Sequence, residues 1–289
     1  MSERHFSEKS IVLLVVWLSA FGMPVMLSAT NVAIPIVANQ FSLSATQIAW
    51  IPMSYLMASV MFVLIFGKLA DVFGKKKIFL TGLLVLCFSS IFVAFANSGT
   101  FLMLGRFLQG VGAAMLYATQ TAMVSSVYPA KERGKAIGLT LSAVYLGLAL
   151  GPTLGGIVME YLSWRLNFVL HLPLTLIILA LLHKVPNDAE GRHVEEFKFD
   201  KTGASLYVVS IALLCFGISN LPNSNSIVLL IFFLITVALF VNHSLKHSSP
   251  IWNLRIFKSN TMLTKSCLAS YMMYSATYLN VVILSVNIS

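Results

Sequence analysis

One short segment places a single carboxylate among lysines, with two glycines at a fixed spacing around it. The pattern is Gly67-x-x-x-Asp71-x-x-Gly74, followed at once by Lys75 and Lys76. Asp71 can accept hydrogen bonds from basic groups or from the start of a helix, and the glycines let helix ends approach closely. A plain basic turn needs these charges but not this spacing. The segment therefore predicts a polar contact between neighbouring connections of the chain.

A second group of polar residues lies inside apolar runs, beginning with Arg106 and Gln109. An ionisable side chain in hydrocarbon is costly and usually functional. Arg106 also stands close enough to a predicted span boundary for its charge to reach the interface instead. Five more polar or aromatic side chains each predict a cavity-lining position or an interhelical hydrogen bond. They are Asn31, Tyr55, Tyr117, Gln120 and Tyr145.

Long apolar runs must position these residues. The chain is 58% hydrophobic and only 10% charged, whereas a soluble domain carries about 25% charged residues. A helix needs roughly 20 apolar residues to cross a bilayer, and continuous rather than alternating runs argue against a β-barrel. We therefore predict an all-α integral membrane protein. The predicted spans are 11–37, 46–66, 78–97, 101–127, 137–159, 166–183, 203–220, 226–243 and 264–286.

The net charge of +9 follows the predicted topology. All lysines and arginines except Arg106 and Arg165 lie before the first span, in alternate connections, or, for Lys265, at the edge of such a connection. The positive-inside rule makes that face cytoplasmic, so we predict a multi-pass protein of the cell (plasma) membrane with a cytoplasmic N-terminus and no nucleic-acid partner. The first run is too long for a signal peptide and is interpreted as a retained helix.

The sequence contains none of the common motifs of enzyme active sites, phosphate-binding sites or metal sites. It contains no nucleophile elbow, no phosphate-binding glycine loop and no clustered metal ligands. We therefore predict neither an enzyme, nor a cofactor, nor a metal site.

The fifth predicted span carries a stripe of small residues. Gly147, Gly151 and Gly155 stand four residues apart, which puts them on one helix face and favours close helix packing in lipid. Pro152 removes a backbone hydrogen bond and favours a kink. Gly156 completes a Gly-Gly pair at the end of the stripe.

These motifs resemble those of the major facilitator superfamily of secondary transporters. The segment from Gly67 to Gly74 resembles the signature loop between its helices 2 and 3, and the surroundings of Arg106 resemble its fourth-helix motif. The glycine stripe with its Gly-Pro and Gly-Gly pairs resembles the antiporter motif, which is seen mainly in exporters. Further similarities point to the fourteen-helix drug:proton antiporter branch. They lie at 164–168, 199–203 and 250–257.

The resemblance implies a particular domain organisation. A six-helix N-terminal bundle of inverted 3+3 repeats would occupy 1–183, and a cytoplasmic linker 184–202. The two central helices of the branch would follow in 203–243. A connector and the first helix of a truncated C-terminal bundle would fill 244–289, giving about three helices beyond the bundle. The repeat also leaves a trace in the sequence, because Gly67, Asp71 and Lys76 share their offsets with Gly156, Glu160 and Arg165.

The resemblance also implies roles for single residues. The loop around Asp71 would be a cytoplasmic latch that stabilises one access state, with Glu132 and Arg133 as local partners. Arg106 would take part in proton coupling or in binding anionic groups. The branch usually carries an aspartate five residues before Asn31, where this chain has Met26, and no acidic residue lies deep in any predicted span. His171 in the sixth span either titrates or packs as a hydrogen-bonded residue.

The function implied is transport across the lipid bilayer. We predict proton-coupled efflux of small drug-like molecules, of the kind that gives antibiotic resistance, with protons as the coupling ion. The chain supplies one bundle and little of a second, so we expect a separately encoded C-terminal half or self-association. The alternative is a non-transporting remnant or a membrane sensor that retains the N-terminal bundle.

Overall fold

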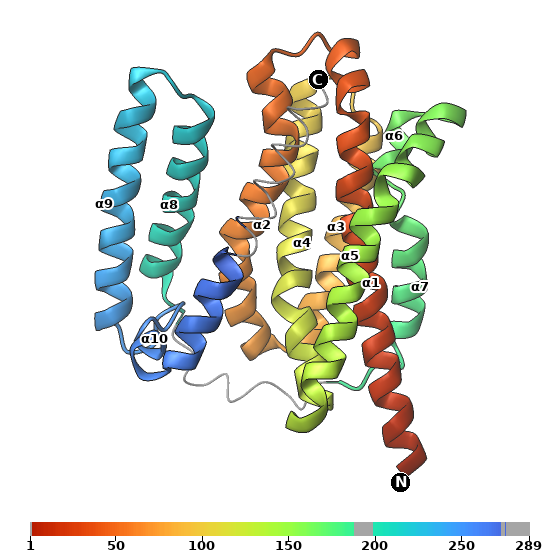
Figure 1. Cartoon of the computed structure of the whole chain (residues 1–289), viewed down its shortest axis with the longest axis vertical. Coiled ribbons are helices and arrows are strands. Elements are labelled where there is room, and N and C mark those ends of the chain that lie inside the picture. Colours follow the sequence, from red (N-terminus) through yellow and green to blue (C-terminus); the bar gives the residue numbers. More distant parts are fainter. Residues whose placement is uncertain (1, 188–198, 273–274, 276–289) are drawn as a thin grey trace.

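The computed structural model describes residues 2–187, 199–272 and 275, and these residues form helices joined by short turns (Figure 1). The ninth predicted span, 264–286, lies largely outside the described residues. Residues 261–272, just after the last labelled helix, are also helical. The labelled helices are α1 (Ser2–Gln40), α2 (Ala45–Phe73), α3 (Lys75–Ala94), α4 (Gly99–Val127), α5 (Ala130–Tyr161), α6 (Trp164–Asn167), α7 (Leu172–Leu182), α8 (Lys201–Ser219), α9 (Ser224–Lys246) and α10 (Arg255–Ser259).

Eight segments of the described chain are long and apolar enough to cross a membrane. They coincide with the first eight predicted spans, with α6 and α7 together forming the sixth, Trp164–Leu182. Most of these helices run beyond the apolar residues that predicted them. The reason is that hydropathy marks only the part of a helix that lies in hydrocarbon, while the backbone hydrogen bonds continue into the polar flanks.

The connection between α2 and α3 is shorter than the sequence predicts. α2 continues to Phe73 and α3 begins at Lys75, so Gly74 alone joins them. Gly74 has a φ of 94°, a conformation that residues with a Cβ rarely adopt. A Cβ at Gly67 would meet nothing within 4 Å, so this glycine does not serve the close helix approach that we expected of it.

The sixth span is interrupted, which the sequence analysis did not predict. α6 ends at Asn167, and residues 168–171 form turns before α7 begins at Leu172. Pro173 stands in the first turn of α7, where its missing N–H costs no helical hydrogen bond. The break turns the backbone carbonyl of Phe168 and the side chain of His171 into the bundle, where both contact polar groups of other helices.

Successive membrane-length spans reverse direction, so the connections between them alternate between two ends (Figure 1). The start of α1, the α2–α3 connection and the α4–α5 connection lie at the same end, which we call the basic end. The second set of the repeat, Gly156 to Arg165, lies at the opposite end. An inverted repeat requires this placement.

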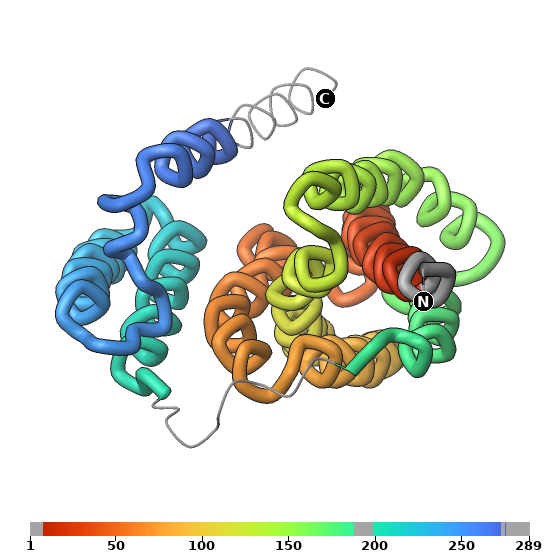
Figure 2. Tube along the Cα trace, turned by 90° about the horizontal axis from the view of Figure 1, so that it is seen from below, coloured from red at the N-terminus to blue at the C-terminus, as the bar shows by residue number. Residues whose placement is uncertain are grey.

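Helices α1 to α7 form one bundle, and α8 and α9 form a hairpin beside α2 (Figures 1 and 2). The main apolar core of the bundle joins α1, α3, α4 and α7 through Val16, Leu83, Leu116 and Ile178. The hairpin is attached through α8, where the hydroxyl of Tyr207 donates to a carbonyl oxygen of α2 at 2.7 Å.

The glycine stripe of α5 packs against α1. A Cβ at Gly151 would lie 2.6 Å from Cβ of Ser28, and one at Gly155 would lie 2.8 Å from Cα of Ala29. Gly147 is similarly close, at 2.5 Å from the backbone oxygen of Phe21. By contrast, Gly156 faces open space, with nothing within 4 Å. α5 continues through Pro152 as one helix.

We expect Gly151→Val to lower the free energy of unfolding by about 1–3 kcal/mol, because α1 and α5 must separate to admit the side chain. Thermal unfolding of the protein in detergent micelles measures this change. Gly156→Val is the matched control, since it makes the same substitution on the same helix where space is open. Equal losses in the two variants would contradict the packing argument.

Candidate functional site

Arg106 lies in the interior of the bundle and does not reach the interface. Its side chain is 0% exposed, seven residues into α4. Nη1 donates to Oε1 of Gln109 at 2.8 Å, and Nε donates to the backbone oxygen of Ile51 at 3.4 Å. Gln109 is one helical turn further along α4 and is also fully buried. The structure thus joins the two residues that the sequence analysis paired.

Aromatic rings cover the guanidinium of Arg106. Its Cζ lies 4.6 Å from the ring centroid of Tyr55 on α2 and 5.7 Å from that of Phe168. Such contacts stabilise a cation, more strongly when water is excluded. Gly110 makes the approach of α2 possible, because a Cβ there would collide with the backbone oxygen of Tyr55. The hydroxyl groups of Tyr55 and Tyr117 lie 3.3 Å apart.

From Gln109 the polar contacts continue to α3 and to the start of α7. Nε2 of Gln109 donates to Oγ of Ser90 at 2.7 Å. Oγ of Ser90 lies 3.3 Å from Nε2 of His171. We call this chain of contacts the core network. It consists of Tyr117, Tyr55, Arg106, Gln109, Ser90 and His171.

Among the described residues, no carboxylate is paired with the positive charge of the core network. Nη2 of Arg106 is buried and has no hydrogen-bond partner among the described residues, and the same holds for Nδ1 of His171. Met26, which stands where the resembling branch usually has aspartate, is fully buried, with its sulfur 3.6 Å from Nε2 of Gln109. Position 26, where the resembling branch usually has an aspartate, therefore lies directly against the core network.

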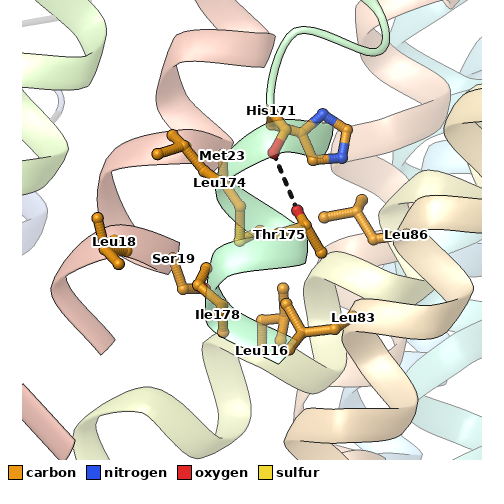
Figure 3. Close-up of a pocket in the computed structure, with 11 residues that line it drawn as sticks. Leu18, Ser19, Met23, Leu83, Leu86, Leu116, His171, Leu174, Thr175 and Ile178 are labelled. Carbon is orange, nitrogen blue, oxygen red and sulfur yellow. Dashed lines mark hydrogen bonds between the residues drawn. The ribbon is translucent and has the colours of Figure 1, made fainter. Parts of the chain in front are cut away.

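A small cavity of about 10 Å³ adjoins the core network, roughly the minimum that holds one water molecule. It lies between α1, α3, α4 and α7, and Figure 3 shows His171 and Thr175 among its lining residues. Ser19, on the α1 side of the cavity, accepts a hydrogen bond from Gln120 at 2.9 Å. Gln120 is thus part of a separate contact between α4 and α1.

Asp71, Glu132 and Arg133 are not paired with one another in the described part of the chain. Asp71 is exposed, and its carboxylate makes no hydrogen bond or ion pair with the described residues. Glu132 pairs with Lys9 of α1 at 3.4 Å, and Arg133 donates to the backbone oxygen of Tyr128 at 2.9 Å. Lys76 donates to the backbone oxygen of Val185, just after α7, at 2.6 Å. In this conformation Glu132 and Lys76 fasten the ends of α1 and α7 instead.

Three of the predicted cavity residues lie at the surface. Asn31 and Tyr145 are exposed and are not part of the core network. Tyr117 is 41% exposed and connects the core network to the outside.

The structure also brings together three residues that the sequence analysis did not single out. Asp200, His243 and His247 offer ligand atoms that all lie within 4.8 Å of one another. This corrects the prediction that the chain has no clustered metal ligands. Two histidines four residues apart at the end of a helix were a usable signal, but their carboxylate comes from another helix and is distant in sequence.

Reversing membrane-length helices around a buried charged site are the architecture of one half of a secondary transporter. Residues 16–287 match the model of the Major Facilitator Superfamily. The chain is a member of the Major Facilitator Superfamily and an integral membrane protein.

Relatives of this chain carry transporter names. It is 30% identical to the riboflavin transporter RibZ of Clostridioides difficile over 256 residues, covering 87% of this chain and 55% of that protein. It is 29% identical to the multidrug resistance protein Stp of Mycobacterium tuberculosis over 237 residues, covering 80% and 44% respectively. The chain therefore spans about half the length of these relatives.

Solved transporters share the fold. The POT family transporter PepTSo superposes with a TM-score of 0.60 at 14% identity, covering 81% of this chain and 52% of that one. The proton:xylose symporter XylE gives a TM-score of 0.55 at 14% identity, with coverages of 85% and 55%.

We expect Gln109→Leu to destabilise the protein more than Gln120→Leu. Gln109 accepts a hydrogen bond from a buried cation, a bond worth about 1.5–3 kcal/mol, whereas the bond from Gln120 to Ser19 is neutral and worth about 1 kcal/mol. Both glutamines are buried on α4, so the pair is matched in chemistry and setting. Thermal unfolding in detergent compares them. A loss in Gln120→Leu as large as that in Gln109→Leu would contradict this account of Arg106.

Proposed function

We propose that this chain is the N-terminal part of a drug:proton antiporter of the fourteen-helix branch, which exports small drug-like molecules. The observation that carries the proposal is the core network. It contains the buried cation Arg106, whose Nη2 has no partner among the described residues, and it reaches the surface at the half-exposed Tyr117. The names of its relatives support the substrate class, since one is a multidrug resistance protein and another transports riboflavin.

In this proposal the surface residues Asn31, Tyr117 and Tyr145 line one wall of the translocation path. Amphipathic aromatic side chains suit drug-like substrates, because they offer an apolar face together with a hydrogen-bonding group. Tyr117 links this wall to Arg106 through Tyr55. A change of charge or of hydrogen bonding at the wall therefore reaches the buried cation through two side chains.

Two buried nitrogen atoms of the core network have no hydrogen-bond partner among the described residues, and in this proposal they couple a change of charge to movement. Arg106 has a donor, Nη2, without a partner, and His171 has a ring nitrogen without one. A carboxylate or other anion that approached the core network would satisfy the charge. One arrangement of the helices that contribute to the core network would then become more stable than another. In this way binding is coupled to movement of a bundle.

In this proposal the opposing wall corresponds to the part of the relatives that this chain does not cover, since the chain spans about half of their length. A separately encoded C-terminal half or a second copy of the chain would supply it. A specific observation favours the alternative of a non-transporting membrane sensor or remnant: the carboxylate of Asp71 makes no hydrogen bond or ion pair with the described residues.

We expect drug efflux from cells that express this chain together with the C-terminal half of a relative, and loss of that efflux in Arg106→Ala. Minimum inhibitory concentrations for a drug panel and the export of riboflavin measure it. Lys135→Ala is the control, because Lys135 is an exposed cation at the start of α5. Efflux that persists in Arg106→Ala would contradict the role given to Arg106. Efflux that never appears with any partner half or with the chain alone would favour the sensor or remnant.

We expect Met26→Asp to cost less stability than Met23→Asp. Both methionines are buried on α1 and both contact a glutamine of α4, at 3.6 Å for Met26 and 3.9 Å for Met23. Only the glutamine beside Met26 binds Arg106, so only an aspartate at 26 gains a nearby cation. Thermal unfolding at pH 7 compares the variants. An equal loss would mean that position 26 is not a coupling site.

A further inference from the structure

The hairpin of α8 and α9 holds an acidic side chain in a nearly closed setting at the basic end. Asp200 caps α8, its side chain is 2% exposed, and both of its oxygens are held by backbone amides. Oδ1 accepts from the N–H of Gly203 at 2.8 Å, and Oδ2 accepts from the N–H of Ile251 at 3.2 Å. The carboxylate is thus fixed in position and orientation by one amide of α8 and one amide of the connector after α9.

Two histidines at the end of α9 surround this carboxylate. Nε2 of His243 lies 2.7 Å from Oδ1 of Asp200. His247 follows one helical turn later, with its ring centroid 5.0 Å from that of His243. Nδ1 of His247 accepts a hydrogen bond from the N–H of Ser249 at 3.2 Å, which fixes the orientation of the second ring.

We propose that Asp200, His243 and His247 bind a divalent transition-metal ion, with Zn²⁺ as the best fit. Two imidazoles and one carboxylate form a ligand set that such ions prefer. Their ligand atoms lie within 4.8 Å of one another, so small side-chain movements bring all three to coordination distance. Water would complete the coordination shell.

The hydrogen bonds around the site suit a metal. Ligand carboxylates are oriented by outer hydrogen bonds, here from the amides of Gly203 and Ile251. The same carboxylate lies 2.7 Å from Nε2 of His243, so it already faces one of the other proposed ligands.

A simpler account of the cluster is a helix cap closed by one ion pair. Asp200 and His243 alone satisfy that account, because they form the 2.7 Å contact. It gives no role to His247, which contacts the ring of His243 and the backbone of Ser249. His247 is therefore the residue that separates metal binding from structural capping.

A bound ion would join three parts of the chain: the start of α8, the end of α9, and the connector that holds Ile251. The connector leads into α10 and the residues that follow. The metal would thus fix the direction in which the chain leaves the hairpin. A transporter could be regulated at this point without any change at the core network.

The test uses the full chain, purified in detergent with a tag that contains no histidine. Zn²⁺ binding is followed by calorimetry, and Co²⁺ binding by visible absorption. We expect one ion per chain and a rise in melting temperature on adding Zn²⁺. His247→Ala should weaken binding roughly tenfold or more while lowering the melting temperature of the metal-free protein less than His243→Ala does.

Two further variants complete the design. His243→Ala should lose metal binding and also lower the melting temperature without metal, since it removes the cap contact as well. His183→Ala, at an exposed histidine outside the cluster, should bind like the wild type. Absence of stoichiometric binding would overturn the proposal. Equal loss in the His247 and His183 variants would overturn it too, by showing scattered surface binding.

Discussion

The structure of the bundle depends on burying the guanidinium of Arg106, to which no carboxylate of the described residues is paired. Taking a charge out of water costs several kcal/mol even after relaxation. The compensation is assembled from weaker parts: the amide of Gln109, the backbone oxygen of Ile51, and the rings of Tyr55 and Phe168. These parts come from α2, α4 and the turn after α6. Solvating one cation therefore requires three segments to stay in place together.

The same requirement explains the interruption of the sixth span. A continuous helix would keep the carbonyl oxygen of Phe168 within its own hydrogen bonds, whereas the break lets it accept from Gln109 at 3.5 Å. The turn also brings His171 to within 3.3 Å of Ser90. Irregular backbone at membrane depth is tolerated where protein surrounds it, and here Phe168 and His171 are both almost fully buried. The break is thus part of the polar core.

The sequence was sufficient for those features that depend on composition and on spacing along one helix. Hydrocarbon thickness sets the length of apolar runs, so eight spans could be predicted. The pairing of Arg106 with Gln109 follows from a separation of one helical turn. The contact of Ser90 with His171, and the approach of Asp200 to the histidines of α9, depend on which faces of separate helices meet. No local pattern encodes that choice. Asp71 shows the converse, because it belongs to a clear motif and yet its carboxylate forms no hydrogen bond or ion pair with the described residues.

In our proposal, the position of the buried Arg106 charge also explains why this bundle needs an opposing wall. Within the described residues the core network has only one exposed member, Tyr117. Its other members are surrounded by packed helices, so no external anion reaches them through the core. Any group that neutralises Arg106 must therefore act from the side of Tyr117, through Tyr55. In our proposal that side is the translocation path, and the cation is left incompletely solvated so that occupation of the path can stabilise one arrangement of the helices over another.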